Sequence, residues 1–196
     1  MSWEINGKFL FQAVEILNAG GILIFPTDTA FGIGCRMDKK KAIERIFKIR
    51  KRPKNQAVPV LVSSIEMAKK YLLPLPKEVE DLMKKYWPGA LTIVYPCQIK
   101  KVPFLVRGRG KTLGVRMPNH QVPLQLIKLV KVPILGPSAN FHGQPTPYKF
   151  EDLDKNLLKL VDLVIPGQCQ VGLVSTVIDC SQKPWKIIRK GAIKIC

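Results

Sequence analysis

Helical patterns alternate with short apolar runs along this chain, and this alternation limits the folds it can adopt more than any other feature. The first pair lies at the N-terminal end, where apolar side chains recur with helical spacing over residues 8–18 and a Gly-Gly pair follows. Residues 21–25 then form an apolar run that stops at Pro26, as expected of a short buried strand. A helix followed by a buried strand is the repeating unit of an α/β fold.

The same alternation continues to the end of the chain. Further helices are predicted over residues 38–50, with Asp38 as N-cap, and over 65–71, 77–86, 123–130 and 150–160. Further strands are predicted over residues 57–62, 90–95, 113–116, 132–135, 161–165, 174–178 and 185–189. Residues 97–112 have no regular pattern, and Gly32-Ile33-Gly34 is interpreted as a turn at a strand end. We expect a twisted mixed sheet flanked by helices, although the pattern does not give the order of the strands.

The length and composition predict a single domain that covers residues 1–196. A chain of 196 residues has the usual size of one domain, and no segment is typical of a long linker. Hydrophobic residues make up 46% of the chain and charged residues 23%, so a sizeable core can be buried without help from metals or disulfides. We expect an autonomously folded unit.

The charge is strongly positive and unevenly distributed. Lysine and arginine total 32 against 14 acidic residues, a formal net charge of +18. No acidic residue lies between Asp81 and Glu151, a stretch that contains eleven cationic residues. A surface that is merely solvated usually mixes both signs, although unpaired surface lysines are the competing interpretation. We therefore expect a positively charged concave groove that binds phosphate or nucleic acid.

The inventory of reactive residues excludes several classes of site and enzyme. The chain has five cysteines without a CxxC pair and two histidines, His120 and His142, which argues against a zinc site and against classical catalytic triads. No phosphate loop of the GxxxxGK[ST] type occurs, and Met37 stands where a dinucleotide fingerprint needs its third glycine. The N-terminal residues do not resemble a signal peptide, and no apolar run approaches about 18 residues. We expect a cytoplasmic protein with no membrane association.

Loops rich in hydroxyl, amide and guanidinium groups follow several of the predicted strands. They contain Thr27, Thr29, Arg50, Arg52, Arg116, Ser138, Asn140, Ser175 and Arg189. Ligands of open α/β sheets bind outside the strand ends, and arginine matches phosphate and carboxylate oxygens. Such a site would bind a polyanion beside a small polar molecule and would act by positioning and charge stabilisation. The competing interpretation is structural: the threonines form a turn, and Ser138 and Asn140 cap a helix or bind loop amides.

Eight motifs in order along nearly the whole chain resemble the YrdC-like threonylcarbamoyl-AMP synthases. They are FPTDTAFGIGC, the helix leading to KIRKRP, VPVLVSS, WPGALTIVY, TLGVRMPNH, PILGPSANFHGQPTP, STVIDCS and IIRKGAI. The resemblance implies a YrdC-like fold and a nucleotidyltransferase that condenses L-threonine, bicarbonate and ATP to threonylcarbamoyl-AMP and pyrophosphate. The product would serve threonylcarbamoyladenosine modification of tRNA, so tRNA or structured RNA and the threonylcarbamoyl-transfer proteins are the implied partners.

The resemblance also implies roles for individual residues. Thr29, Arg116 and Ser175 would bind threonine. Arg50, Arg52, Ser138 and Asn140 would be the catalytic residues, and together with Arg189 they would bind ATP and its phosphates. No residue is expected to be a metal ligand, because Mg2+ would be held mainly through the ATP phosphates.

Three departures from the family pattern stand out. Arg50 occupies the position of a lysine, Gln56 and Ala57 stand where lysine or asparagine and then proline are usual, and His142 replaces a small polar residue. A guanidinium fork differs from a compact ammonium in how it meets phosphate oxygens. The chain ends soon after Arg189, so the resemblance is to the short form that consists of the YrdC domain alone.

Two other functions are compatible with the sequence. The charge of +18 and the stretch without carboxylates suit a noncatalytic RNA-binding or ribosome-assembly factor. The fold family also occurs in carbamoyl-adenylate enzymes of another pathway, such as hydrogenase maturation. Dependence of the reaction on threonine distinguishes the leading hypothesis from both.

Overall fold

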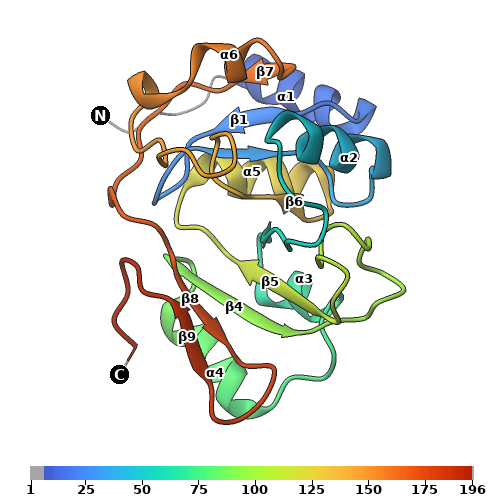
Figure 1. Ribbon diagram of the computed structural model, residues 1–196, viewed down its shortest axis with the longest axis vertical. Helices are drawn as coiled ribbons and strands as arrows, with labels where there is room; N and C mark the ends of the chain where they lie inside the picture. Colours follow the sequence, from blue (N-terminus) through green and yellow to red (C-terminus); the bar gives the residue numbers. More distant parts are fainter. Residues whose placement is uncertain (1–6, 196) are drawn as a thin grey trace.

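The computed structural model describes residues 7–195, which form nine strands and six α-helices with one short 3-10 helix (Figure 1). The strands are β1 Leu23–Phe25, β2 Gly32–Gly34, β3 Val60–Leu61, β4 Leu91–Pro96, β5 Thr112–Arg116, β6 Ile134–Leu135, β7 Leu163–Val164, β8 Thr176–Asp179 and β9 Lys186–Arg189. The helices are α1 Gly7–Ala19, α2 Lys40–Ile49, α3 Ile65–Lys69, α4 Lys77–Tyr86, α5 Gln121–Val130, η1 Phe150–Asp152 and α6 Lys155–Leu158.

The strands form two mixed sheets. The smaller sheet has the order β2-β1-β7, and the larger one has the order β6-β3-β5-β4-β8-β9. In the view of Figure 1 the smaller sheet lies in the upper part of the molecule with α1, α2 and α6, and most of the larger sheet lies below it with α3 and α4. Both sheets contain parallel and antiparallel pairs: β1 is antiparallel to β2 and parallel to β7, while β5 is antiparallel to β4 and parallel to β3. The predicted mixed α/β architecture is confirmed, with two sheets where one was expected.

Backbone hydrogen bonds between β2 and the segment that begins with β6 join the two sheets. The Leu135 N–H donates to the Cys35 carbonyl at 2.9 Å, and the Ile33 N–H donates to the Pro137 carbonyl at 2.9 Å. The Ala139 N–H continues the series with a bond of 2.8 Å to the Phe31 carbonyl. The ends of both sheets are thereby held at a fixed distance, which is the condition for a site built from loops of each.

Strand β1 is buried on both faces and divides the core into two clusters. Leu23 and Phe25 point to the cluster that includes α1 and α5, while Ile22 and Ile24 point to the cluster that includes α2. Because successive side chains of a strand lie on opposite faces, a continuous apolar run is what a strand covered on both sides requires. This explains why the run at residues 21–25 contains no polar residue.

Most predicted elements are confirmed, and most of the strands are shorter than predicted, but three local predictions were wrong. Asp38 does not cap α2, whose N-cap residue is Lys39; the Asp38 carboxylate instead accepts hydrogen bonds from Arg36, at 2.7 Å from Nη2. The helix predicted over 150–160 is broken into η1 and α6, because Asp154 caps a new helix by accepting from the Asn156 N–H at 2.7 Å.

The third wrong prediction concerns Gly32-Ile33-Gly34, which is strand β2 and not a turn. A Cβ atom at Gly34 would lie 2.1 Å from the Leu135 carbonyl oxygen. Glycine is needed here because the backbones of β2 and β6 approach closely, and the same pattern can be mistaken for a turn. Among the described helices, none is both long and apolar enough to cross a membrane.

Candidate functional site

A cavity of about 150 Å3, open to solvent, lies where loops of the two sheets meet. The loop between β1 and β2, the end of α2, the ends of β3 and β5, the segment after β6 and the start of β8 all contribute to it. Its lining consists of Thr27, Thr29, Ala30, Phe31, Gly32, Arg50, Arg52, Pro59, Leu61, Thr92, Arg116, Gly136, Pro137, Ser138, Thr146, Val174, Ser175 and Arg189. Four arginines and six hydroxyl side chains therefore surround one space.

Arg116 is held in one orientation by three partners. Its Nε donates to the Gly89 carbonyl at 3.0 Å, its Nη1 donates to Thr29 Oγ1 at 2.7 Å, and its Nη2 forms a buried ion pair with Asp28. Thr27 forms the turn that presents Thr29, since its hydroxyl accepts from the Ala30 N–H at 3.2 Å. The structural interpretation thus applies to Thr27, while Thr29 faces the cavity beside Arg116.

A second group joins strand β4 to the start of β8 and the end of β9. The hydroxyls of Thr92 and Ser175 lie 2.8 Å apart, and Arg189 Nη2 donates to Ser175 Oγ at 2.8 Å. Arg189 Nε also donates to the Ser175 carbonyl at 3.0 Å. The Ser175 hydroxyl is therefore fixed between a cation and a second hydroxyl, with its oxygen at the cavity wall.

The third group surrounds Arg50 at the end of α2. Arg50 is 3% exposed; its Nε donates to the Asn140 carbonyl at 2.9 Å and its Nη2 to Asn140 Oδ1 at 3.0 Å. Ser138 Oγ donates to the same Asn140 Oδ1 at 2.7 Å. The remaining nitrogen, Nη1, is buried and has no hydrogen-bond partner among the described residues. An unpaired buried donor on a cation is costly, and Arg50 is one of the residues that line the cavity.

Arg52 is folded back onto its own loop. Its Nε donates to the Gln56 carbonyl at 3.2 Å and its Nη2 to the Ala57 carbonyl at 2.6 Å. The departures at Gln56 and Ala57 thus lie at positions whose backbone carbonyls hold Arg52. His142 lies outside the cavity lining, and its backbone N–H donates to the Arg50 carbonyl at 2.8 Å.

Burial disfavours the positive charge of each of the four arginines in the cavity wall. Burial, and then the charge of Arg52, lowers the pKa of Arg50 to about 10. Burial also lowers the pKa of Arg52 and of Arg189, and it lowers the pKa of Arg116 although Asp28 acts in the opposite direction. Each shift means that the surroundings disfavour the cation, and of the four arginines Arg116 is paired with a carboxylate, that of Asp28.

Seven of the eight predicted site residues line this one cavity: Thr29, Arg50, Arg52, Arg116, Ser138, Ser175 and Arg189. The eighth, Asn140, lies behind the wall and contacts Arg50 and Ser138. Three residues of the site were missed as site residues: Asp28, Thr92 and Thr146. Thr92 was detectable, because it is a hydroxyl inside the apolar strand LTIVY, between the buried residues Leu91 and Ile93.

The described residues around the cavity provide few side chains that could coordinate a metal ion. Among the described residues, no three histidine, cysteine or acidic side chains gather in a way that could hold a metal. The Asp28 carboxylate is engaged by Arg116, and the other groups that face the cavity are hydroxyls and cations. A divalent cation would fit here only together with an anionic ligand that carries it. Cys35 and Cys180 are buried, and burial raises their pKa values to about 12.

Two mixed sheets that join at a cationic, hydroxyl-lined cavity define the class of α/β protein to which this chain belongs. The chain belongs to the Sua5/YciO/YrdC family, whose model, described as telomere recombination, matches residues 15–191. A threonylcarbamoyl-AMP synthase of Pyrococcus abyssi is 33% identical over 93% of this chain and 54% of its own length, and one of Bacillus subtilis is 33% identical over 96% and 55%. The chain thus spans about half the length of these curated relatives.

Solved structures agree with the family assignment. The crystal structure of P. abyssi Sua5 complexed with L-threonine superimposes with a TM-score of 0.90 at 31% identity, covering 97% of this chain and 56% of the other. The crystal structure of Escherichia coli YciO superimposes with a TM-score of 0.84 at 28% identity, and there the coverage is 97% and 96%. The YrdC-like fold that the sequence predicted is confirmed.

Proposed function

We propose that this chain is a threonylcarbamoyl-AMP synthase that binds ATP and L-threonine side by side in the cationic cavity. The observation that carries the proposal is that four arginines line one cavity, and that Arg50 among them is buried. Arg52 lies in the same wall, and the two charges repel each other. A polyphosphate is the ligand that neutralises several guanidinium groups at once.

The amino acid would bind at the opposite side, around Arg116. Two of the three guanidinium nitrogens of Arg116 are held by Asp28 and Thr29, which fixes the plane of the group. Nη1 and Nη2 each carry a second N–H, and a carboxylate accepts such paired donors from one guanidinium. The hydroxyls of Thr29 and Ser175 are fixed in the same cavity and would orient the amino and hydroxyl groups of threonine. The P. abyssi relative that binds L-threonine supports this assignment.

The reaction needs positioning more than an enzyme nucleophile. The amino group of threonine and bicarbonate form a carbamate with loss of water, a carbamate oxygen then forms a bond to the α-phosphorus of ATP, and pyrophosphate leaves with the electron pair of the broken P–O bond. Arg50, Arg52 and Arg189 would stabilise the charge on the phosphoryl oxygens. Ser138 and Asn140 would keep Arg50 in place through the bonds of 2.7 and 3.0 Å. Mg2+, held by the ATP phosphates, would supply further charge neutralisation.

The product would be used in the cytoplasm by the proteins that transfer the threonylcarbamoyl group to tRNA. The reason is chemical: a mixed carbamic-phosphoric anhydride is reactive and must meet its acceptor soon after release. The excess of cationic over acidic residues, 32 against 14, supports contact with RNA at some stage of this transfer.

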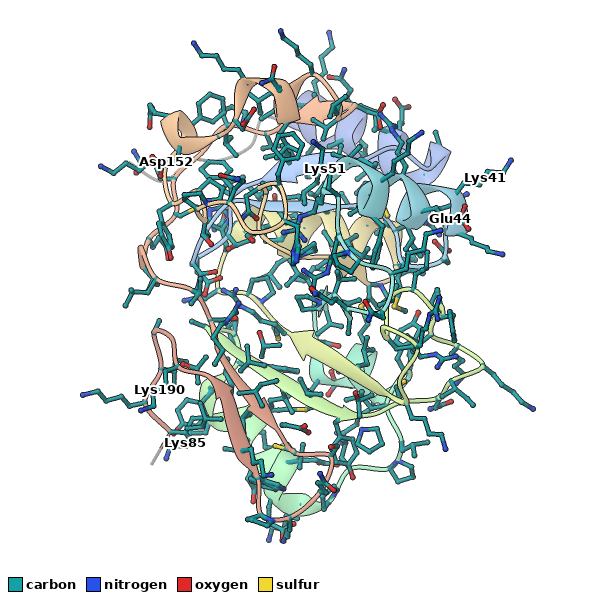
Figure 2. The ribbon with its side chains drawn as sticks, in the orientation of Figure 1. Lys41, Glu44, Lys51, Lys85, Asp152 and Lys190 are labelled. Carbon is teal, nitrogen blue, oxygen red and sulfur yellow. The ribbon has the colours of Figure 1, made fainter. Side chains whose placement is uncertain are left out.

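Pyrophosphate release tests the proposal. The purified protein is expected to release pyrophosphate from ATP only when threonine and bicarbonate are both present, and Arg52→Ala or Asn140→Ala is expected to abolish the release. Lys41→Ala is the control, because Lys41 points outward from α2, away from the body of the molecule (Figure 2). Isothermal titration with threonine, with and without ATP, measures the coupling of the two subsites.

The other functions predict other results. Release that ignores threonine contradicts the synthase. Activity with carbamoyl phosphate in place of threonine and bicarbonate indicates a carbamoyl-adenylate enzyme of another pathway. Steeply salt-dependent binding of structured RNA without a saturable ATP or threonine site indicates a noncatalytic RNA-binding factor.

A further inference from the structure

The segment between β4 and β5, residues 97–111, is a basic arm that the cavity does not account for. In Figure 1 it is the yellow-green loop that projects from the sheet on the right. It carries five cationic residues and no acidic one: Lys100, Lys101, Arg107, Arg109 and Lys111. Within the described arm, the Arg107 guanidinium donates to the Val102 carbonyl at 3.3 Å and to the Gly110 carbonyl, and Lys101 Nζ donates to the Lys70 carbonyl at 3.2 Å.

An exposed aromatic ring lies among these cations. Phe104 is 51% exposed, and the guanidinium carbons of Arg107 and Arg109 lie 5.2 and 5.7 Å from its ring centroid. Cation–π contact at these distances orders both guanidinium groups, and Arg109 is exposed to solvent. The combination offers an ordered cationic surface together with a flat apolar one.

The backbone at Arg109 is unusual for a residue with a side chain. Arg109 has φ 70° and follows Gly108 with φ 56°, so two successive residues adopt the left-handed conformation. Glycine takes this conformation without strain, whereas other residues do so at a cost, and such residues often lie at functional positions. The sequence places glycines on both sides, in Arg107-Gly108-Arg109-Gly110, yet keeps an arginine at the strained position between them.

The arm is packed against the loop that carries Arg52. A Cβ atom at Gly108 would lie 2.4 Å from the Ala57 nitrogen and 2.8 Å from the Asn55 carbonyl oxygen. The Val58 N–H also donates to the Val106 carbonyl at 2.9 Å. The backbone of the arm is thus packed directly against the loop 52–57 at the edge of the cavity, and a long anion can contact both segments.

We propose that the basic arm binds RNA, with Arg109 and its neighbours on the phosphates and Phe104 as a stacking surface for a base. RNA provides both kinds of partner, since its phosphates pair with guanidinium groups and its bases stack on aromatic rings and on arginine. An acidic protein segment would use the charges but gains nothing specific from the ordered guanidinium–phenyl layer. The inference does not depend on the proposed synthase activity, because binding is measured without ATP or threonine.

Arg109→Gly tests the proposal, because it removes the cation and suits the backbone. We expect the melting temperature to change by no more than about 2 °C, while the affinity for a transcribed tRNA falls about five-fold at moderate salt and the slope of log K against log salt decreases by about one. Lys131→Gly is the matched control: Lys131 also has a left-handed backbone, with φ 60°, and is exposed, and its loss removes the same charge at the end of α5.

Phe104→Ala is the second variant, and it remains informative should Arg109→Gly fail to fold. Loss of a stacking surface is expected to weaken tRNA binding by about ten-fold with little change in the salt slope. Equal affinities of Arg109→Gly and Lys131→Gly, or an unchanged affinity in Phe104→Ala, would overturn the proposal. Competition by polyglutamate as effective as competition by tRNA would overturn it as well, because it would assign the arm to acidic proteins.

Discussion

Arg116 and Asp28 form an ion pair that connects the two sheets through the wall of the cavity. Arg116 ends β5 in the larger sheet, and Asp28 lies in the loop between β1 and β2 of the smaller one. Their side chains are 7% and 4% exposed. The Asp28 carbonyl also accepts from the Gln170 and Val171 N–H groups at 3.2 and 2.9 Å. The segment that leads to Ser175 is therefore held by the same residue that orients Arg116.

Replacement of Asp28 by asparagine is expected to weaken both the fold and the amino-acid subsite. Breaking a buried pair leaves an uncompensated charge, which costs about 3–5 kcal/mol. We expect the free energy of unfolding, measured by urea denaturation, to fall by about this amount, and we expect threonine affinity in isothermal titration to fall at least about ten-fold because Arg116 is no longer oriented.

Asp38→Asn is the matched control for this substitution. Asp38 pairs with Arg36 at 2.7 Å, but its side chain is 47% exposed, and pairs of this kind contribute about 0–1 kcal/mol. Similar losses in the two variants would contradict the role assigned to Asp28. Loss of stability with unchanged threonine affinity would mean that Asp28 joins the sheets without orienting Arg116.

Pyrophosphate is expected to stabilise the protein through Arg50. A ligand that binds only the folded state adds about 2.7 kcal/mol to the free energy of unfolding when its concentration is one hundred times its dissociation constant. The melting temperature should therefore rise with pyrophosphate concentration. Arg50→Ala should abolish the rise, whereas Lys41→Ala should retain it. A control with sodium chloride at the same ionic strength distinguishes specific binding of pyrophosphate from general screening of the protein's charges by salt. A rise that persists in Arg50→Ala would assign the anion to another position.

The buried cysteines are expected to be inert in the folded protein. Burial raises the pKa of Cys35 and of Cys180 to about 12 and that of Cys169 to about 11. The reactive thiolate is therefore scarce at pH 8. Iodoacetamide at pH 8, followed by mass spectrometry, should label Cys35 and Cys180 only after denaturant is added. Rapid labelling in the native protein would contradict their burial.

The raised pKa of Cys35 makes the free energy of unfolding depend on pH. A thiol whose pKa is raised on folding contributes its full stabilisation below its ordinary pKa of 9.0 and loses it as the pH rises towards 12. The difference in unfolding free energy between the wild type and Cys35→Ala should therefore narrow between pH 8 and pH 10. A constant difference across this range would contradict the raised pKa of Cys35.

The sequence predicts a candidate site residue where a polar or charged side chain follows a predicted strand. It does not predict one whose place in the site depends on a contact with a residue far away in the chain. Arg116 and Ser175 carry functional groups at predicted strand ends, so both were found. Asp28 belongs to the same loop as Thr29, yet its role depends on a partner 88 residues away, which no local pattern reveals. The unpaired Nη1 of Arg50 depends likewise on where Asn140 lies, 90 residues further along.

The fold, too, could be predicted from sequence in its local features but not in its long-range strand pairing. The burial of β1 on both faces could be inferred from its uninterrupted apolar run. The presence of two sheets in place of one could not, because strand pairing between β2 and the segment after β6 links residues about a hundred positions apart. The strands β3, β6 and β7 have two residues each, too few for a period of two to be visible.

The junction of the sheets leads to a final prediction, at Gly34. A side chain there would lie 2.1 Å from the Leu135 carbonyl oxygen and 3.0 Å from the Phe25 ring, so β2 and β6 would have to separate. Gly34→Ala is expected to lower the free energy of unfolding by about 2–3 kcal/mol, as overpacking does, and to weaken ATP and threonine binding because Thr29 and Ser138 belong to opposite sides of this junction.

Gly114→Ala is the control for Gly34→Ala, since Gly114 also lies within a strand. The nearest atom to a Cβ at Gly114 is at 3.6 Å, which is an ordinary contact. The free energy of unfolding of Gly114→Ala should therefore fall by no more than about 1 kcal/mol. Urea denaturation and isothermal titration of both variants provide the measurement. If Gly34→Ala were as stable as Gly114→Ala, the close approach of β2 and β6 would not exist in solution, and the cavity between the sheets would lack the contact that sets its width.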